Sequence, residues 1–325
     1  MVILTLILLA FSLLSLSVGS TNIPFKDIFN IFLSGGGTTE YSILFDIRLP
    51  RILLGFAVGG SLSLAGVILQ GIFRNPLVEP YTLGISGGAA LGVSLNIVLR
   101  ATRYGGVLTL PVYGFLGGIA AAIIVYYISI KNGRLNIQTL LLTGVMLSFI
   151  TSSLVMLLMA VSRAENLQTI IYWIMGSLDE PNPLLINAAI IVSITGLVAS
   201  YLFSLELNAL SLGEEGALHL GVDIDKTKRI LFVIASLLTG FSVSVAGVIG
   251  FVGLVVPHFI RLLVGGDHRI LLIGSFLGGG IFLIFSDTVA RTIISPMELP
   301  VGVITGIVGG TIFVYALSKK RMVLG

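Results

Sequence analysis

Cysteine is missing from all 325 residues of the sequence, and histidine occurs only three times. A chain without thiols forms no disulfide, no thiolate metal site and no cysteine nucleophile, and three histidines are too few for a histidine-rich metal site. Charged residues are scarce as well: they make up 10% of the chain, whereas soluble proteins carry roughly a quarter. The formal net charge of +3 is spread over loops, which gives no indication of nucleic-acid binding.

A phosphate-binding loop of the form G-x-x-x-x-G-K-[ST] is also missing, so the chain should not hydrolyse ATP itself. Apolar residues, in contrast, are abundant: they make up 56% of the sequence, and the mean hydropathy is +1.09. Forty glycines accompany them, and small residues let helices pack closely in lipid. The composition therefore predicts an integral membrane protein.

Uncharged runs long enough to cross a bilayer, about 17–25 residues each, recur along the whole chain. We place them at 2–19, 52–73, 80–99, 104–130, 135–160, 184–205, 230–257, 270–286 and 299–318. The segment 252–266 is interrupted by Pro257 and Arg261, and it is expected to form a shorter or half-buried helix. The first run has no Lys or Arg before it, so we interpret it as a span and not as a cleaved signal peptide. The sequence thus predicts an all-α, polytopic fold of about ten transmembrane helices, in a single domain over residues 1–325.

The segment 163–183 is mixed in polarity and does not fit this series. Its apolar centre, residues 170–178, is too short to cross a bilayer. Tyr172 and Trp173 are side chains that favour the membrane–water interface. We predict an interfacial or re-entrant helix at this position.

Lysine and arginine predict the orientation, because cytoplasmic loops carry an excess of both. Ten segments with both termini in the cytoplasm place most of these residues inside, including the basic residues 319–321. Arg48, Arg51 and Arg291 are left outside, against the rule. Three arginines on the wrong side call for a functional explanation.

The longest densely charged interruption lies at 205–229, between two apolar runs, and must lie outside the bilayer where water solvates its ions. Gly213 and Gly221 bracket a short helix, and Gly221 suits a left-handed end cap. Asp223 can cap a second helix that leads into the next span. We therefore predict a cytoplasmic knob of two short helices to which a partner protein could bind. The alternative is a loop that is only solvated.

An internal repeat relates residues 59–76 to residues 240–257. At a constant offset both copies share an initial glycine, two serines, the run Ala-Gly-Val-Ile and a final proline. If the copies are the second and seventh spans, they run in opposite directions. Such an inverted repeat is typical of transporters, although a duplicated bundle without transport would share it.

Several motifs, in this order, resemble one family of membrane proteins. They are Arg48-Leu-Pro-Arg51; residues 65–70 (AGVILQ), 74–80 (RNPLVEP) and 83–89 (LGISGGA); then residues 250–261 (GFVGLVVPHFIR), 267–269 (DHR), 287–291 (DTVAR) and 298–306 (ELPVGVITG). The chain is similar over nearly its whole length to the permease subunits of type II ABC importers. This FecCD-like group takes up iron–siderophore complexes, haem and cobalamin.

The resemblance implies a transport subunit and not an enzyme. It implies a homodimer with two ATPase subunits, which bind ATP-Mg, and an extracytoplasmic substrate-binding protein. It implies no cofactor or metal in this chain, and a prokaryotic cytoplasmic membrane as the location. The expected cargo is a bulky metal chelate, with iron(III)-siderophore first and cobalamin, haem or molybdate/tungstate as alternatives.

The resemblance also assigns residues. Arg48, Arg51 and Arg291 are expected to meet acidic residues of the binding protein; lipid-headgroup anchoring is the alternative. The knob at 205–229 is expected to be the coupling segment that seats in the ATPase. Its contact residues are expected to be Gly213, Glu214, Glu215, Ala217, His219, Leu220, Gly221 and Asp223.

A gate is expected where the fourth and fifth spans meet, at Asn136, Ile137, Gln138 and Thr139, with Met146 further along. The polar members of this group are equally compatible with an ordinary helix start. Met146, Met156 and Met159 share a helical face, for which core packing is favoured over a greasy pore lining.

Two other functions compete with an ATP-driven importer. An ion-coupled secondary transporter also uses inverted repeats, but it usually buries an ionisable group in the membrane, and the assigned spans are nearly free of them. A membrane-embedded enzyme would need a catalytic cluster in the bilayer, and none is apparent in the sequence.

Overall fold

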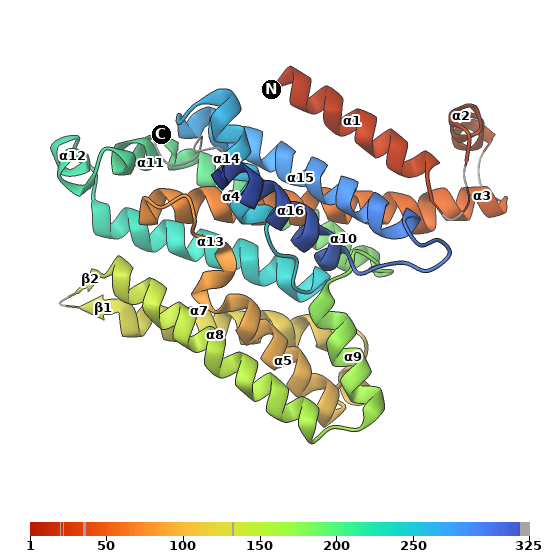
Figure 1. Cartoon of the computed structure of the whole chain (residues 1–325), viewed down its shortest axis with the longest axis horizontal. Coiled ribbons are helices and arrows are strands. Elements are labelled where there is room, and N and C mark those ends of the chain that lie inside the picture. Colours follow the sequence, from red (N-terminus) through yellow and green to blue (C-terminus); the bar gives the residue numbers. More distant parts are fainter. Residues whose placement is uncertain (20, 22, 35–36, 132, 319–325) are drawn as a thin grey trace.

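The computed structural model describes residues 1–19, 21, 23–34, 37–131 and 133–318, and the basic residues 319–321 lie outside this part. The described chain is built mainly of helices (Figure 1). Helices follow from the apolar runs, because a backbone in lipid must satisfy its hydrogen bonds within its own segment. Among the described residues the one sheet is an antiparallel hairpin of β1 (Ile130–Lys131) and β2 (Arg134–Leu135).

The helices are, in chain order, α1 (Val2–Ser17), α2 (Phe25–Ser34), α3 (Thr39–Ser42), a π-helical turn (Ile43–Arg48), α4 (Leu49–Phe73), a 3-10 turn (Pro80–Leu83), α5 (Ile85–Leu99), α6 (Thr102–Gly105), α7 (Thr109–Ser129), α8 (Ile137–Ala160), α9 (Ala164–Met175), α10 (Pro183–Leu202), α11 (Ser204–Ser211), α12 (Glu214–His219), α13 (Ile224–Ala246), α14 (Val252–Val264), α15 (His268–Thr292) and α16 (Val301–Ser318). In the described residues, six long apolar helical stretches can cross a membrane and four shorter apolar helices accompany them. The predicted all-α fold with its ten membrane segments is confirmed.

Three of the predicted boundaries are wrong. The run 80–99 is not one helix, because the 3-10 turn comes first and α5 starts at Ile85. The run 230–257 is not one span, because α13 ends at Ala246 and α14 starts at Val252. The turn between them is held by side chains from elsewhere: the Tyr81 hydroxyl accepts from the Ile249 amide at 3.0 Å, and Glu79 Oε1 accepts from the Phe251 amide at 2.6 Å. The run 270–286 is too short, since α15 continues through Asp287 and Arg291 to Thr292.

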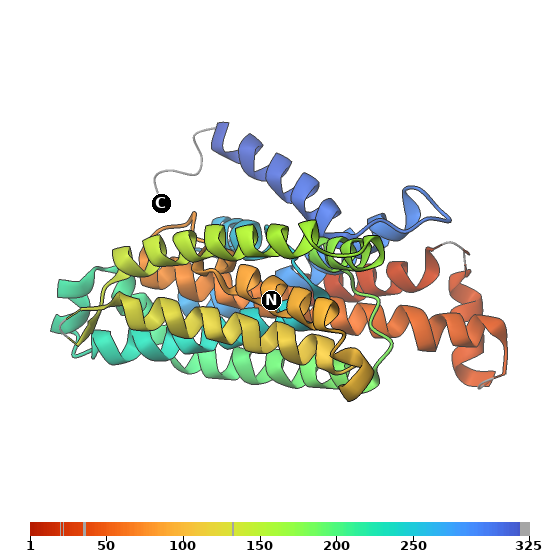
Figure 2. The same cartoon turned by 90° about the horizontal axis from the view of Figure 1, so that it is seen from below.

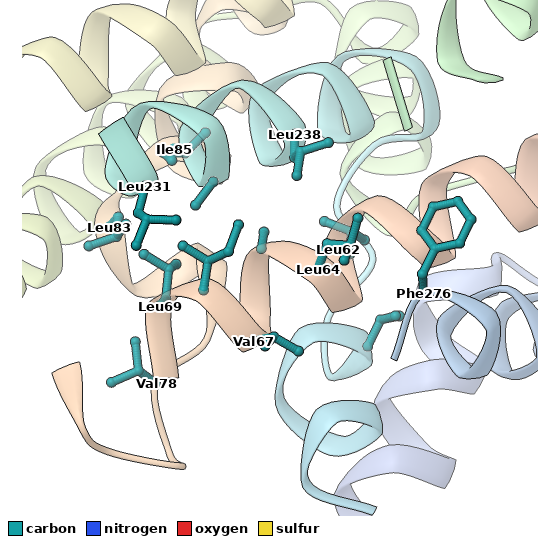
Figure 3. Packing of buried hydrophobic residues seen from close by; sticks show 14 of the residues in the cluster. Leu62, Leu64, Val67, Leu69, Val78, Leu83, Ile85, Leu231, Leu238 and Phe276 are labelled. Atoms are coloured by element: carbon teal, nitrogen blue, oxygen red, sulfur yellow. The ribbon is translucent and has the colours of Figure 1, made fainter. Parts of the chain in front are cut away.

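Helix α4 is the centre of the bundle. It packs against α10, α13, α14 and α15, and almost all of its length is buried. Figure 3 shows Leu62 and Leu69 in the same apolar cluster as Leu231 and Leu238 of α13 and Ile85 at the start of α5. Because lipid tails are as apolar as leucine, close packing and not expulsion from water holds such helices together.

Glycines make the closest of these contacts. A Cβ on Gly66 of α4 would lie 1.9 Å from the carbonyl oxygen of Gly253 in α14. A Cβ on Gly59 would lie 2.2 Å from the carbonyl oxygen of Gly279 in α15. The backbones of α14 and α15 therefore touch the backbone of α4 at positions where no other residue fits.

Helices α4 and α13 run in opposite directions (Figure 1), as the inverted repeat predicts. The sequence match extends further than the structural likeness, however. Residues 59–73 are helical throughout, whereas the second copy contains the end of α13, a turn and the start of α14. Helices α1 and α16 also run in opposite directions (Figure 1), so the start of α1 and the end of α16 face the same end of the bundle. Seen from below, α16 slants away from the other helices toward its end (Figure 2).

Candidate functional site

The charged segment 205–229 forms the end of the molecule that carries α11 and α12 (Figure 1). The predicted short helix is α12, which lies between Gly213 and Gly221, both with positive φ. Asp223 caps α13 as predicted: its carboxylate accepts from the Lys226 amide at 3.0 Å, and α13 continues directly into the next span. A helix before this pair, α11, was not foreseen.

Polar side chains tie this segment to the membrane helices. Lys228 of α13 is only 4% exposed and donates to Glu214 Oε1 of α12 at 2.8 Å. This hydrogen bond holds the pKa of Glu214 below its ordinary value. On the other side, the Asn208 side chain of α11 donates to Asp267 Oδ1 at 2.8 Å and accepts from the His268 amide at 2.9 Å, where α15 begins. The short helices are therefore attached to α13 and α15 and do not form a loose loop.

The outer face of the segment combines leucines with charge. Leu212, Leu218 and Leu220 are exposed beside Glu215 and His219, whereas Ala217 is buried beneath them. A cavity of about 1150 Å³ opens next to this face, between α11, the start of α13 and Gly266-Asp267. Exposed apolar side chains on a charged segment are a feature that protein interaction sites share, so the part of this face given to the ATPase stays a prediction.

The three arginines predicted to dock a binding protein lie near one another at the opposite end, but all are buried. Arg48 donates to the carbonyls of Leu16 and Thr21. Arg291 donates to Asp287 at 2.9 Å and to the Ser15 hydroxyl at 2.9 Å.

The third, Arg51, pairs with Asp179 at 3.2 Å and with Glu298 at 2.7 Å. In the single chain, all three guanidinium groups thus bind partners within the chain. Their role in docking stays a prediction.

The candidate gate lies at the start of α8. Asn136 is the N-cap of this helix, and its side chain accepts from the Thr139 amide at 2.9 Å and the Thr139 hydroxyl at 3.0 Å, so both residues serve the helix start. Asn136, Ile137 and Gln138 line a cavity of about 1180 Å³ that is also lined by Glu214 and Lys228. The gate position and the 205–229 segment therefore face the same space.

The methionines of α8 differ from the expectation. Met146 and Met156 are exposed in the single chain, and only Met159 packs against a buried cluster. The prediction of core packing within the chain is therefore wrong for Met146 and Met156. The exposed face of α8 that they share includes Leu142, Phe149 and Leu157.

The sequence model of one protein family, described as the FecCD transport family, matches residues 6–319. The chain belongs to the FecCD transport family. Its relatives include the cobalamin import system permease protein BtuC of Halobacterium salinarum, 44% identical over 87% of this chain and 75% of that protein. The hemin transport system permease protein HmuU of Yersinia pestis is 38% identical over 98% of this chain and 95% of that protein.

A solved structure of a metal-chelate type ABC transporter in an inward-facing conformation has the same fold as this FecCD chain, with a TM-score of 0.84, 33% identity and 97% of each chain covered. Other relatives are named for the import of ferric dicitrate and molybdate. The family is one of ABC importer permeases, so this chain is a transport subunit of that type.

Several residues of this FecCD permease were not foreseen from its sequence. Lys228 and Asn208 attach the 205–229 segment, and Asp179 and Glu298 bind Arg51. Except for Lys228, whose partner Glu214 lies in the same segment, these residues have partners far away in the sequence, which offers no local signal for such pairs. Only Lys228 could have been suspected, as a charge just inside the start of a span.

Proposed function

We propose that this chain is the membrane-spanning half of an ATP-driven importer that moves a bulky metal chelate into the cell by alternating access. The observation that carries the proposal is the 205–229 segment, which exposes leucines to a partner while Glu214 and Asn208 bind helices α13 and α15. A loose loop could not transmit force to the spans. We place the protein in the cytoplasmic membrane of a prokaryote, with both termini in the cytoplasm.

The ATPase subunits are the partners at the 205–229 segment. When they bind ATP-Mg and close, they displace α12, and the displacement reaches α13 through the Lys228–Glu214 pair. It continues to the gate along the β1–β2 hairpin. Arg134 of the hairpin lies 3.8 Å from Asp225 of α13, and Arg229 donates to the Gly133 carbonyl. Because Asn136 follows the hairpin and caps α8, the gate moves with the hairpin.

A second copy of the chain completes the pathway. The face of α8 that carries Met146, Phe149 and Leu157 is apolar and exposed in the single chain. In α16, Gly306 has open space where a Cβ would lie, unlike the glycines that pack within the chain. These faces are suited to lie along the axis of a homodimer, where each copy would line half of the translocation pathway.

The substrate we propose is an iron(III)–siderophore complex or another chelate of similar size. Relatives named for cobalamin, hemin and ferric dicitrate support this class, and one named for molybdate leaves an oxyanion as the alternative. An apolar pathway that binds its cargo weakly suits bulky complexes, and selectivity would then be a property of the binding protein.

Uptake by reconstituted complex tests the proposal. The chain would be co-expressed with the ATPase and binding protein encoded beside it and placed in proteoliposomes. ATP-dependent accumulation of ferric siderophore, with cobalamin, hemin and molybdate as competitors, is the expected result. The proposal fails if no ATPase co-purifies and no substrate enters.

A further inference from the structure

Arg51 lies in the first turns of α4 and joins three parts of the chain. Its Nη2 atom is 3.2 Å from Asp179, in the loop between α9 and α10, and 2.7 Å from Glu298, in the loop between α15 and α16. The arginine side chain is 6% exposed, whereas those of Asp179 and Glu298 are 68% and 48% exposed. The two carboxylates therefore cover the guanidinium from the solvent side.

The guanidinium group of Arg51 does not use all of its hydrogen-bond donors in this arrangement. Both carboxylates bind the same nitrogen, and Nε of Arg51 is buried without a hydrogen-bond partner in the described chain. A guanidinium presents its donors as a planar fork that fits one carboxylate with two parallel hydrogen bonds. A buried N–H group without an acceptor costs free energy, so a ligand that accepts from both Nε and Nη2 would be favoured over the present pair.

An incoming carboxylate could supply what the two acids do not. If it bound Nε and Nη2 together, it would satisfy the free donor and form the bidentate geometry. Asp179 and Glu298 would lose little, because exposed carboxylates return to water at small cost and such pairs are weak. An exchange of partners at Arg51 is therefore favoured once a carboxylate is held close by a docked protein.

We propose that Asp179 and Glu298 close a latch on Arg51 in the undocked permease, and that a carboxylate of the extracytoplasmic binding protein opens it by replacing them. The proposal rests on the proposed function, which supplies that protein. Opening releases the loop that leads to Asn182, the N-cap of α10, and the loop that leads to α16. Docking would thereby loosen two helices at the outer end of the pathway.

A charge-matched pair of variants tests the latch. Asp179→Asn with Glu298→Gln removes both covering acids, whereas Glu40→Gln with Asp46→Asn removes two exposed acids from the helical stretch that precedes α4. Affinity of the permease–ATPase complex for the substrate-free binding protein would be measured in lipid nanodiscs. The latch variant should bind about tenfold more tightly, since two partly exposed ion pairs need no longer be broken. The control should stay within about threefold of the wild type.

The same measurement can overturn the proposal. If the latch variant binds no more tightly than its control, or more weakly, then the acids are not competitors of the partner. Weaker binding would instead assign Asp179 and Glu298 to basic groups of the binding protein. If the wild-type complex binds no such protein, the proposed function falls with the latch, so the two failures are distinguishable.

Distance measurements test the release of the loops separately. The chain has no cysteine, so Pro181→Cys and Met297→Cys allow two spin labels to be placed on the two loops. The distance between them should lengthen or broaden when the binding protein docks, and Arg51→Gln should show the open distribution without docking. An unchanged distribution on docking would overturn the latch.

Discussion

Glu214 is the residue through which the short helix α12 is attached to a membrane helix. Its carboxylate pairs with the ammonium group of Lys228, whose side chain is 4% exposed. A buried charge that loses its partner keeps its full desolvation cost. Removing the acid should therefore be more harmful than its position on an exposed helix indicates.

We expect Glu214→Gln to destabilise the coupling segment by about 1–3 kcal/mol and to reduce ATP-driven uptake. Glu215→Gln, one residue further along the same exposed helix, is the control for stability alone, because Glu215 is itself an expected ATPase contact. Hydrogen exchange of residues 205–229 in the purified chain without the ATPase measures the effect, and the control should leave it unchanged. Equal protection in the two variants would contradict the role given to Glu214.

The same pair predicts a pH dependence. Because Lys228 lowers the pKa of Glu214, the attachment contributes fully above the unfolded-state pKa of about 4.3 and is lost as the pH falls through the lower folded value. The segment should therefore stay protected at pH 6 and open in the acid range below pH 4.3. The Glu214→Gln variant should lack this acid-dependent step.

At the scale of elements, the packing of α4 depends on glycines that touch other backbones. A Cβ at Gly66 would lie 1.9 Å from a carbonyl oxygen of α14, whereas the nearest atom to a Cβ at Gly240 of α13 would be 3.7 Å away. Backbone cannot move aside as a flexible side chain can. Gly66→Ala should therefore cost about 1–3 kcal/mol or more and lower the thermal midpoint of the purified chain. Gly240→Ala should leave it unchanged, and similar midpoints would refute this packing.

Sequence reasoning worked for elements whose signal is local. Apolar length was sufficient for α7, α8 and α10, and the glycines around α12 were sufficient for its ends. It failed at 247–251, because a turn made of apolar residues looks like part of a span. Glu79 and Tyr81, which satisfy the backbone of that turn, come from a different part of the chain.

The candidate site was likewise predictable only where its signal is local in the sequence. The knob and its caps follow from charge and glycine spacing over a few residues. The burial of Arg48, Arg51 and Arg291 did not follow, since a side chain's neighbours decide whether it faces water. Asp179 and Glu298 carry no sign in the sequence that their partner is an arginine of α4.

At the scale of the whole molecule, the exposed apolar face of α8 would contact a second copy in a dimer and only lipid in a monomer. Phe149 of α8 and Ile191 of α10 are similarly exposed in the single chain. Of these two residues, only Phe149 should meet a second copy if the proposed homodimer forms. Phe149→Cys should therefore cross-link two chains in native membranes, and Ile191→Cys should not. The wild type has no cysteine to give a background, and equal yields for the two variants would argue against this interface.

The burial of Arg48, Arg51 and Arg291 has a consequence for how the protein is made. Arg51 enters the membrane with α4, long before the ribosome has synthesised Asp179 and Glu298. An unpaired guanidinium in a span is costly, so the nascent helix has to remain shallow or be sheltered until its partners arrive. Final seating of α4 is thus a late step of biogenesis. A lesion in either acidic loop would then reduce the amount of assembled protein as well as its activity.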